Sequence, residues 1–63
     1  MKISLKAARV NANLTQEEVA DHLRIHVQTY RKLEDNPDTV TIGQAKKLSA
    51  LLHVSYDEIF FAS

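Results

Sequence analysis

The side chains best suited to binding chemistry lie between Val27 and Asp35, in the stretch VQTYRKLED. At about 100° per residue in a helix, Tyr30 and Leu33 fall on one side of this stretch. The opposite arc consists of Val27, Gln28, Arg31, Lys32 and Asp35. It is short, mostly hydrogen-bonding and net basic. Such a face either binds a partner or is the solvated side of an ordinary helix.

A second predicted helix, over residues 16–23, comes directly before this stretch and would position it. Thr15 is a favourable N-cap, and Glu18 three residues later completes a capping box. Residues 24–25 interrupt the helical period, and a new period begins after them. Two short helices joined by such a corner form a helix-turn-helix, whose second helix can lie in the DNA major groove. A plain helical hairpin has the same periodicity, so the pattern alone leaves both interpretations open.

The composition favours one small intracellular domain. The chain has 63 residues, no cysteine and no net charge, so neither a disulfide framework nor a thiolate metal site stabilises it. Its apolar runs are too short to cross a bilayer and no secretory signal is visible, so we expect a soluble intracellular protein. The charge is unevenly distributed. Residues 1–32 contain six Lys and Arg against three Asp and Glu, whereas residues 33–63 contain two against five.

The rest of the chain predicts three further helices and no strand. Ser4 is a plausible N-cap for a first helix that ends at Asn11–Asn13, and NPDTV at 36–40 is typical of a turn. Capping boxes at Thr41 and Ser55 predict a fourth helix and a last short helix. The apolar stripe of the fourth helix comprises Ile42, Ala45, Leu48, Leu51 and Leu52, and the last helix spans Tyr56–Phe61. The expected architecture is all-α, with five helices in a single domain over residues 1–63.

Three motifs in this arrangement match one known family. They are LTQEEVA at 14–20, YRKLE at 30–34 and AKKLSALLHVSYDEI at 45–59. With them the chain resembles the phage-repressor and Cro-type, or XRE-like, helix-turn-helix DNA-binding domains. The resemblance implies a compact five-helix lambda-repressor-like domain that binds double-stranded DNA sequence-specifically through the major groove. It also implies a transcriptional regulator, a repressor in the first instance, that occupies an operator as a homodimer in the cytoplasm of a bacterial cell or a phage-infected host.

The resemblance assigns roles to individual positions. Arg9 and Glu34 match an internal salt bridge between the first and third helices, which is a structural role. The positions that match phosphate contacts are Thr15, Gln16 and His26. The positions that match readers of base edges are Val27, Gln28 and Lys32, with Arg31 on the same arc reaching either a base or a phosphate. A glutamine suits adenine, a lysine suits guanine, and a valine suits the thymine methyl group.

Some positions depart from the family pattern. Arg24 and His53 stand where the family favours glycine at two corners, and a positive φ at either would add strain of roughly 1 kcal/mol. His26 replaces the usual small hydroxyl N-cap of the third helix. The loop that starts at Asn36 is acidic, so we expect few phosphate contacts from it and modest non-specific affinity.

The sequence gives little support to metal binding or catalysis. His22 and His26 are four apart, but the corner lies between them and no third metal ligand is evident. No nucleophile, base and acid can be assembled, so we expect no enzyme, no metal, no other cofactor and no small-molecule substrate. Tyr56, Phe61 and His53 are candidates for a dimer interface, because apolar side chains are dense for such a short last helix.

Two alternatives remain. The chain is either a DNA-binding regulator or a protein-interaction module, such as an antitoxin or adaptor, that keeps the fold with weak or no DNA binding. The zero net charge favours the module, whereas the hydrogen-bonding arc favours DNA. The 63 residues are either a whole protein or the N-terminal domain of a longer repressor.

Overall fold

Four α-helices make up most of the computed structural model, which describes residues 3–55. They are α1 (Leu5–Asn11), α2 (Gln16–Leu23), α3 (Val27–Asp35) and α4 (Ile42–Leu52), with a short 3-10 helix, η1 (Pro37–Thr39), between α3 and α4. No strand occurs in this part of the chain, and the predicted all-α class is confirmed. The predicted fifth helix, Tyr56–Phe61, lies outside the described residues.

Side-chain caps start three of the helices, each at the residue that the sequence predicts. Ser4 Oγ accepts a hydrogen bond from the backbone N–H of Ala7 at 3.0 Å at the start of α1. Thr15 and Thr41 each form a complete capping box, with Glu18 and Gln44 respectively. These caps satisfy N–H groups that the first turn of a helix leaves without partners. Local sequence therefore determines where α1, α2 and α4 begin.

Three of the helices also end alike, with one residue in the left-handed region. Asn13, Arg24 and His53 have φ of 61°, 59° and 56°. In each case the next residue donates its backbone N–H to the carbonyl five residues earlier, at 3.0–3.3 Å. That next residue is hydrophobic and packs against the core, as in a Schellman closure. The two corners where glycine was expected are therefore built in the left-handed conformation without glycine.

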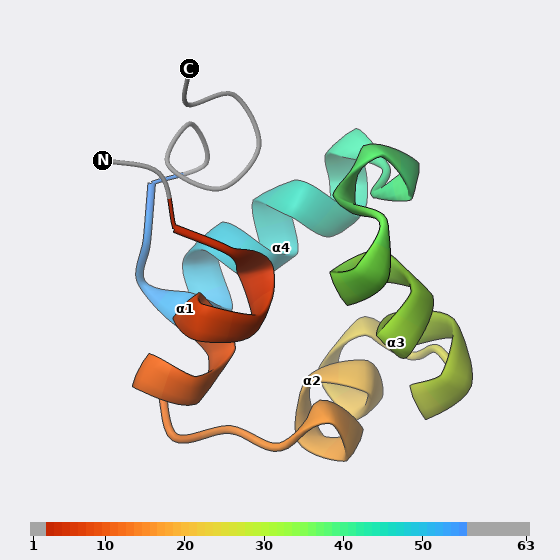
Figure 1. Cartoon of the computed structure of the whole chain (residues 1–63), viewed down its shortest axis with the longest axis horizontal. Helices are drawn as coiled ribbons and strands as arrows, with labels where there is room; N and C mark the ends of the chain where they lie inside the picture. The colour runs from red at the N-terminus through yellow and green to blue at the C-terminus, as the bar shows by residue number, and fades with distance from the viewer. Residues whose placement is uncertain (1–2, 56–63) are drawn as a thin grey trace.

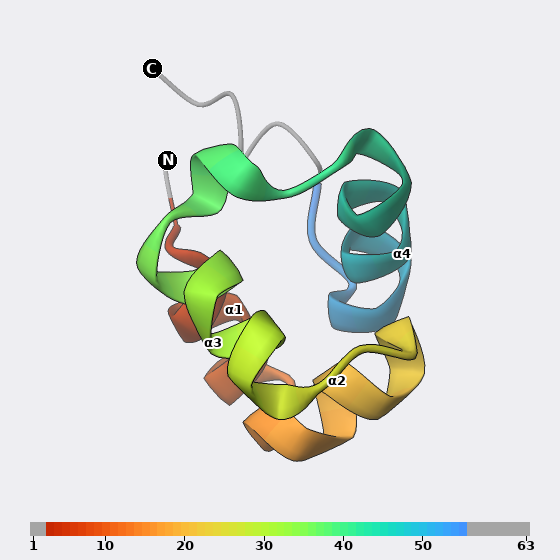
Figure 2. The ribbon, with the colours of Figure 1, turned by 90° about the vertical axis from the view of Figure 1, so that its right-hand side faces the viewer.

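The core lies between all four helices. It is formed by Leu5, Ala8, Val19, Ala20, Leu23, Tyr30, Leu33, Leu48 and Leu52. Figures 1 and 2 show α2 and α3 meeting at one end of the molecule, and in Figure 2 α1 lies behind α3 while α4 stands to the right. In Figure 2, where α3 faces the viewer, no other helix lies in front of it. The core therefore fixes α3 from one side and leaves its other side accessible.

One residue of the predicted core stripe was assigned wrongly. Ile42 is 68% exposed, whereas Ala45, Leu48 and Leu52 of the same helix are buried. At 100° per residue the three buried positions point in nearly one direction, and Ile42 lies about 85° away from it. Ile42 directly follows the Thr41 cap, in the first turn of α4, and lies outside the buried face of the helix.

Candidate nucleic-acid interface

The α2–α3 unit is a helix-turn-helix with a short, hydrogen-bonded corner. Leu23 ends α2, Arg24 adopts φ 59° and ψ 42°, and α3 begins after His26. The backbone N–H of Arg24 donates to Asp21 at 3.0 Å, and that of Ile25 donates to Ala20 at 3.0 Å. These bonds close α2 and turn the chain within three residues, so the direction of α3 is set by backbone geometry.

One side of α3 is buried and the other is open to solvent. Tyr30 is 0% exposed and Leu33 is 5% exposed, so both belong to the core. The outward face carries the predicted arc, and its exposed members are Gln28, Arg31, Lys32 and Asp35. The helical period therefore places amide, guanidinium, ammonium and carboxylate groups side by side on one accessible surface.

Val27 differs from the other members of the arc. It is half-buried and packs against the core. Its position on the helical wheel is about 90° from the buried direction, at the border between the two faces. Only part of this side chain is therefore available to a partner.

Arg9 and Glu34 form a buried ion pair between α1 and α3. Arg9 Nε lies 2.6 Å from Glu34 Oε2, and Arg9 Nη2 lies 3.4 Å from Oε1. Their side chains are only 10% and 5% exposed. Arg9 Nη1 also donates to the carbonyl of Leu14 at 2.9 Å, so the guanidinium holds the α1–α2 loop as well. This pair fixes α3 against the rest of the fold.

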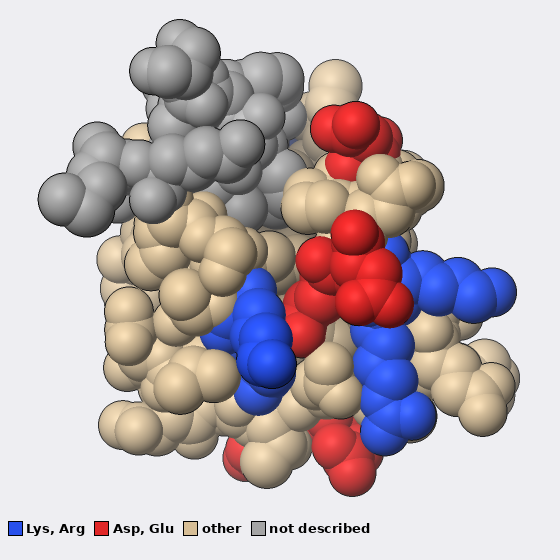
Figure 3. Space-filling view, in the orientation of Figure 1, with Lys and Arg blue, Asp and Glu red and all other residues tan. Residues whose placement is uncertain are grey.

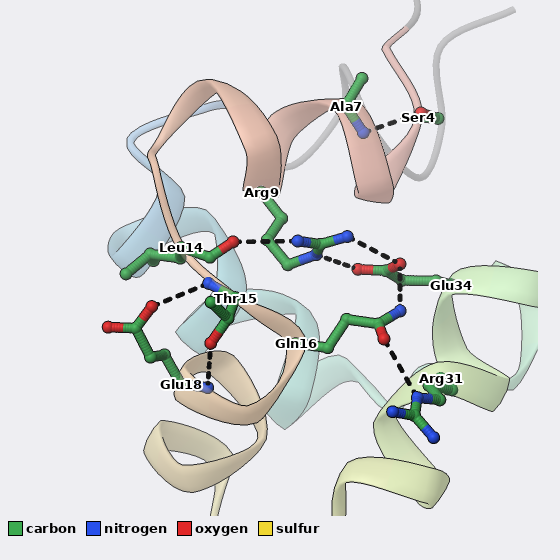
Figure 4. Close-up of polar contacts among 9 residues, drawn as sticks. All are labelled: Ser4, Ala7, Arg9, Leu14, Thr15, Gln16, Glu18, Arg31 and Glu34. Atoms are coloured by element: carbon green, nitrogen blue, oxygen red, sulfur yellow. Dashed lines mark hydrogen bonds and ion pairs between the residues drawn. The ribbon is translucent and has the colours of Figure 1, made fainter.

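Gln16, the first residue of α2, extends this ion pair toward the outer face. Its Nε2 donates to Glu34 Oε1 at 3.0 Å, and its Oε1 accepts a hydrogen bond from Arg31 Nε at 3.0 Å. Figure 4 shows the resulting chain of side chains from Arg9 through Glu34 and Gln16 to Arg31. The amide of Gln16 is therefore engaged at both its oxygen and its nitrogen.

The pKa values of Glu34 and of the neighbouring Tyr30 hydroxyl are both shifted. Burial by itself would raise the pKa of the Glu34 carboxyl, but hydrogen bonds to it, first that of Arg9, outweigh burial and lower the pKa. Burial and the nearby Glu34 carboxylate raise the pKa of the Tyr30 hydroxyl far above its usual range. Glu34 is thus held ionised and Tyr30 neutral over the ordinary pH range.

The three predicted phosphate ligands lie at or near helix starts. Thr15 is exposed, and its Oγ1 accepts the Glu18 N–H at 3.1 Å as part of the cap. The Glu18 carboxylate accepts the Thr15 N–H at 2.8 Å, and this bond lowers the Glu18 pKa. His26 is exposed at the N-cap of α3, and its side chain makes no capping hydrogen bond. Gln16 is half-buried within the network described above.

The remaining site residues are only partly described. His53 is exposed at the left-handed end of α4, while Tyr56 and Phe61 lie outside the described residues. His22 and His26 are both exposed, and no group of three potential metal ligands occurs within residues 3–55. Nor does any helix in the described range have the length and hydropathy needed to span a membrane.

The charged side chains alternate in sign across the surface. Figure 3 shows acidic side chains between the lysine and arginine side chains on one face of the molecule. The nearest acidic neighbours of Gln28, Arg31 and Lys32 along α3 are Glu34, which is paired, and Asp35, which is exposed. The exposed cations of α3 therefore lie beside acidic side chains and are not part of a continuous basic surface.

Sequence reasoning missed the bonds that Gln16 makes. Gln16 and Arg31 are fifteen residues apart on different helices, and nothing in their local sequence signals that they meet. The buried position of the Tyr30 hydroxyl, which has no hydrogen-bond partner in the described part of the chain, was missed in the same way. Both depend on how α2 and α3 cross.

Two short helices with a tight corner, the second held by the core and exposing a polar face, define a helix-turn-helix domain of the DNA-binding regulator class. A protein-family model described as "Helix-turn-helix" matches residues 5–59, and the chain belongs to this family, in its XRE-like branch. The family is one of DNA-binding regulators and not a catalytic one. Comparisons with curated proteins and with solved structures found no match.

Proposed function

We propose that this protein is a sequence-specific transcriptional regulator that places α3 in the major groove of an operator and represses by occupying it. The observation that supports this most is the division of α3 into two faces. Tyr30 and Leu33 anchor the helix in the core, while Gln28, Arg31 and Lys32 stand on the accessible side. A rigid helix that presents hydrogen-bonding side chains matches the width and chemistry of the major groove.

Base recognition in this proposal is shared among three side chains. Gln28 pairs with N6 and N7 of an adenine, Lys32 donates to O6 and N7 of a guanine, and Val27 contacts a thymine methyl group. Because Val27 is half-buried, its contribution is the smallest of the three. Arg31 adds a cation to the same surface.

Phosphate contacts orient the helix. Thr15 and Gln16 lie at the start of α2, and His26 lies at the start of α3. Helix starts expose N–H groups and the positive end of the helix dipole, which suit an anion. Glu17 and Glu18 also lie in the first turn of α2 and oppose this attraction, so we expect the phosphate contribution to be modest.

The operator is expected to be read by two copies of the chain. Symmetric binding places two α3 helices in successive major grooves, about 34 Å apart. His53, Tyr56 and Phe61 remain the proposed contact region between the copies. A palindromic binding site would follow from this symmetry.

The experiment that tests this function is selection of binding sites from a random DNA pool, followed by affinity measurements at several salt concentrations. The proposal predicts a palindromic consensus with half-sites about one helical turn apart. It also predicts that affinity falls as the salt concentration rises, because neutralised phosphates release counterions. Absence of any enriched sequence at low salt and high protein concentration would contradict it.

A protein-interaction module is the second candidate. The chain has no net charge, and the loop around η1 contains Asp38 without a compensating cation. These features weaken attraction to DNA in general. Weak binding to DNA of every sequence, with no steep dependence on salt, would favour this candidate.

A further inference from the structure

The side chains of Glu34, Gln16 and Arg31 form a hydrogen-bonded chain from the interior to the proposed DNA-binding face. Glu34 is fixed by Arg9 at 2.6 Å and is almost fully buried. Gln16 donates to Glu34 and accepts from Arg31, both at 3.0 Å. The exposed Arg31 side chain is therefore connected through Gln16 to a buried, ion-paired carboxylate (Figure 4).

This hydrogen-bonded chain needs one donor and one acceptor at position 16, which a glutamine side chain supplies. Its amide offers an N–H donor to the Glu34 carboxylate and a carbonyl acceptor to the Arg31 guanidinium. A reversed amide would place the carbonyl oxygen against the carboxylate. A glutamate would bond Arg31 but repel Glu34, and a lysine would bond Glu34 but repel Arg31. Gln16 thus joins a buried anion to an exposed cation.

The hydrogen bond to Gln16 uses only the Nε–H group of Arg31. The two terminal nitrogens of the guanidinium remain available as a planar pair of donors. The bond also holds the Arg31 side chain of α3 against the first residue of α2. A planar donor pair suits the paired oxygens of a backbone phosphate, and the bond to Gln16 holds this pair beside the start of α2, where the proposed phosphate contacts lie.

We propose that Gln16 is a positioning residue, which holds Arg31 so that its two terminal nitrogens meet one phosphate of the DNA backbone. The inference rests on the proposed function and assigns the phosphate contact of this region to Arg31. Pre-ordering a long side chain removes part of the entropy cost of binding. Loss of Gln16 should therefore weaken DNA binding roughly 3- to 10-fold, but only while Arg31 is present.

The test is a double-mutant cycle with Gln16→Met and Arg31→Met, measured on the selected duplex and on the same duplex with single base-pair changes. Methionine keeps the length and helix preference of both side chains while removing the hydrogen bonds. We expect each single variant to bind more weakly and the double variant to bind no more weakly than Arg31→Met. Arg31→Met should weaken all the duplexes equally and reduce the slope of log affinity against log salt by about 1.

A matched control separates positioning from general damage. Lys32 lies on the same face and makes no hydrogen bond to Gln16 among the described contacts, so Gln16→Met and Lys32→Met should have additive effects on binding. Unfolding by urea, measured for all variants, distinguishes a structural role. A structural role would give the same coupling between Gln16 and Arg31 in stability and would leave the salt slope unchanged.

Three outcomes would overturn the proposal. An undiminished effect of Gln16→Met in the Arg31→Met background would show that Gln16 acts independently of Arg31. A loss confined to one base pair in Arg31→Met would make Arg31 a base reader. If the unaltered protein binds no duplex at all, the proposed function fails together with this inference, whereas the first two outcomes leave the function intact.

Discussion

Arg9 Nε and Glu34 Oε2 lie 2.6 Å apart and join the first helix to the third inside the fold. Because Glu34 is on α3, the same contact that stabilises the domain also sets the position of the proposed recognition helix. Arg31, on the accessible face, is connected to Glu34 through Gln16. The contacts that stabilise the fold and the proposed recognition surface therefore meet at one buried carboxylate.

Removing one partner of this ion pair should destabilise the domain strongly. Arg9→Met leaves the buried Glu34 charge without its cation, and the expected loss is about 3–5 kcal/mol of unfolding free energy. Urea unfolding followed by circular dichroism measures it. The double variant Arg9→Met/Glu34→Met should lose less than the sum of the two single variants. A loss below about 1 kcal/mol for Arg9→Met would mean that the pair behaves as a surface salt bridge.

Acid should weaken the fold through the same residue. The pKa of Glu34 is lower in the folded protein than its usual value of 4.5, so the unfolded chain binds protons more readily. The contribution of Glu34 is complete above pH 4.5 and is lost as the pH falls through the folded-state pKa. Unfolding measured from pH 7 down to pH 2 should show this decline. Glu34→Gln should flatten the decline, and an unchanged profile in that variant would assign the acid sensitivity to other carboxyl groups.

Glycine should stabilise two of the three helix ends. Arg24 and His53 have left-handed φ values of 59° and 56°, which cost a side-chain-bearing residue energy that glycine avoids. We expect Arg24→Gly and His53→Gly each to raise the unfolding free energy by up to about 1 kcal/mol. Asn13→Gly is the matched control. Because asparagine tolerates φ 61° well, this substitution should raise the unfolding free energy by less. Equal effects at all three positions would argue against backbone strain as the cause.

The two capping threonines allow stability and DNA contact to be separated. Thr15 and Thr41 make equivalent capping boxes, so Thr15→Ala and Thr41→Ala should each cost about 1 kcal/mol of stability. Only Thr15 begins the helix proposed to approach a phosphate. Thr15→Ala should therefore weaken DNA binding, whereas Thr41→Ala should not, as measured at a temperature where both are folded. Equal DNA binding by both variants would show that Thr15 makes no contact with DNA.

Local features of the fold could be predicted from the sequence, because caps and helix ends depend on residues close in the chain. Thr15 with Glu18, and Thr41 with Gln44, signal their helices within four residues. The exposure of Ile42 could not be predicted, since it depends on which side of α4 meets the core. The engagement of Gln16 depends in the same way on the crossing of α2 and α3. The outward face of α3 was predictable from its period alone, apart from the half-burial of Val27.

The most direct test of the central claim is the affinity of Gln28→Ala for the selected operator and for every single base-pair change in it. Gln28 is exposed on α3 and lies outside the buried network, so the variant should fold normally. If α3 reads bases, the variant loses about 1–3 kcal/mol of discrimination at one base pair in each half-site and keeps its preferences elsewhere. An equal weakening for all sequences, or no change, would contradict the placement of α3 in the major groove.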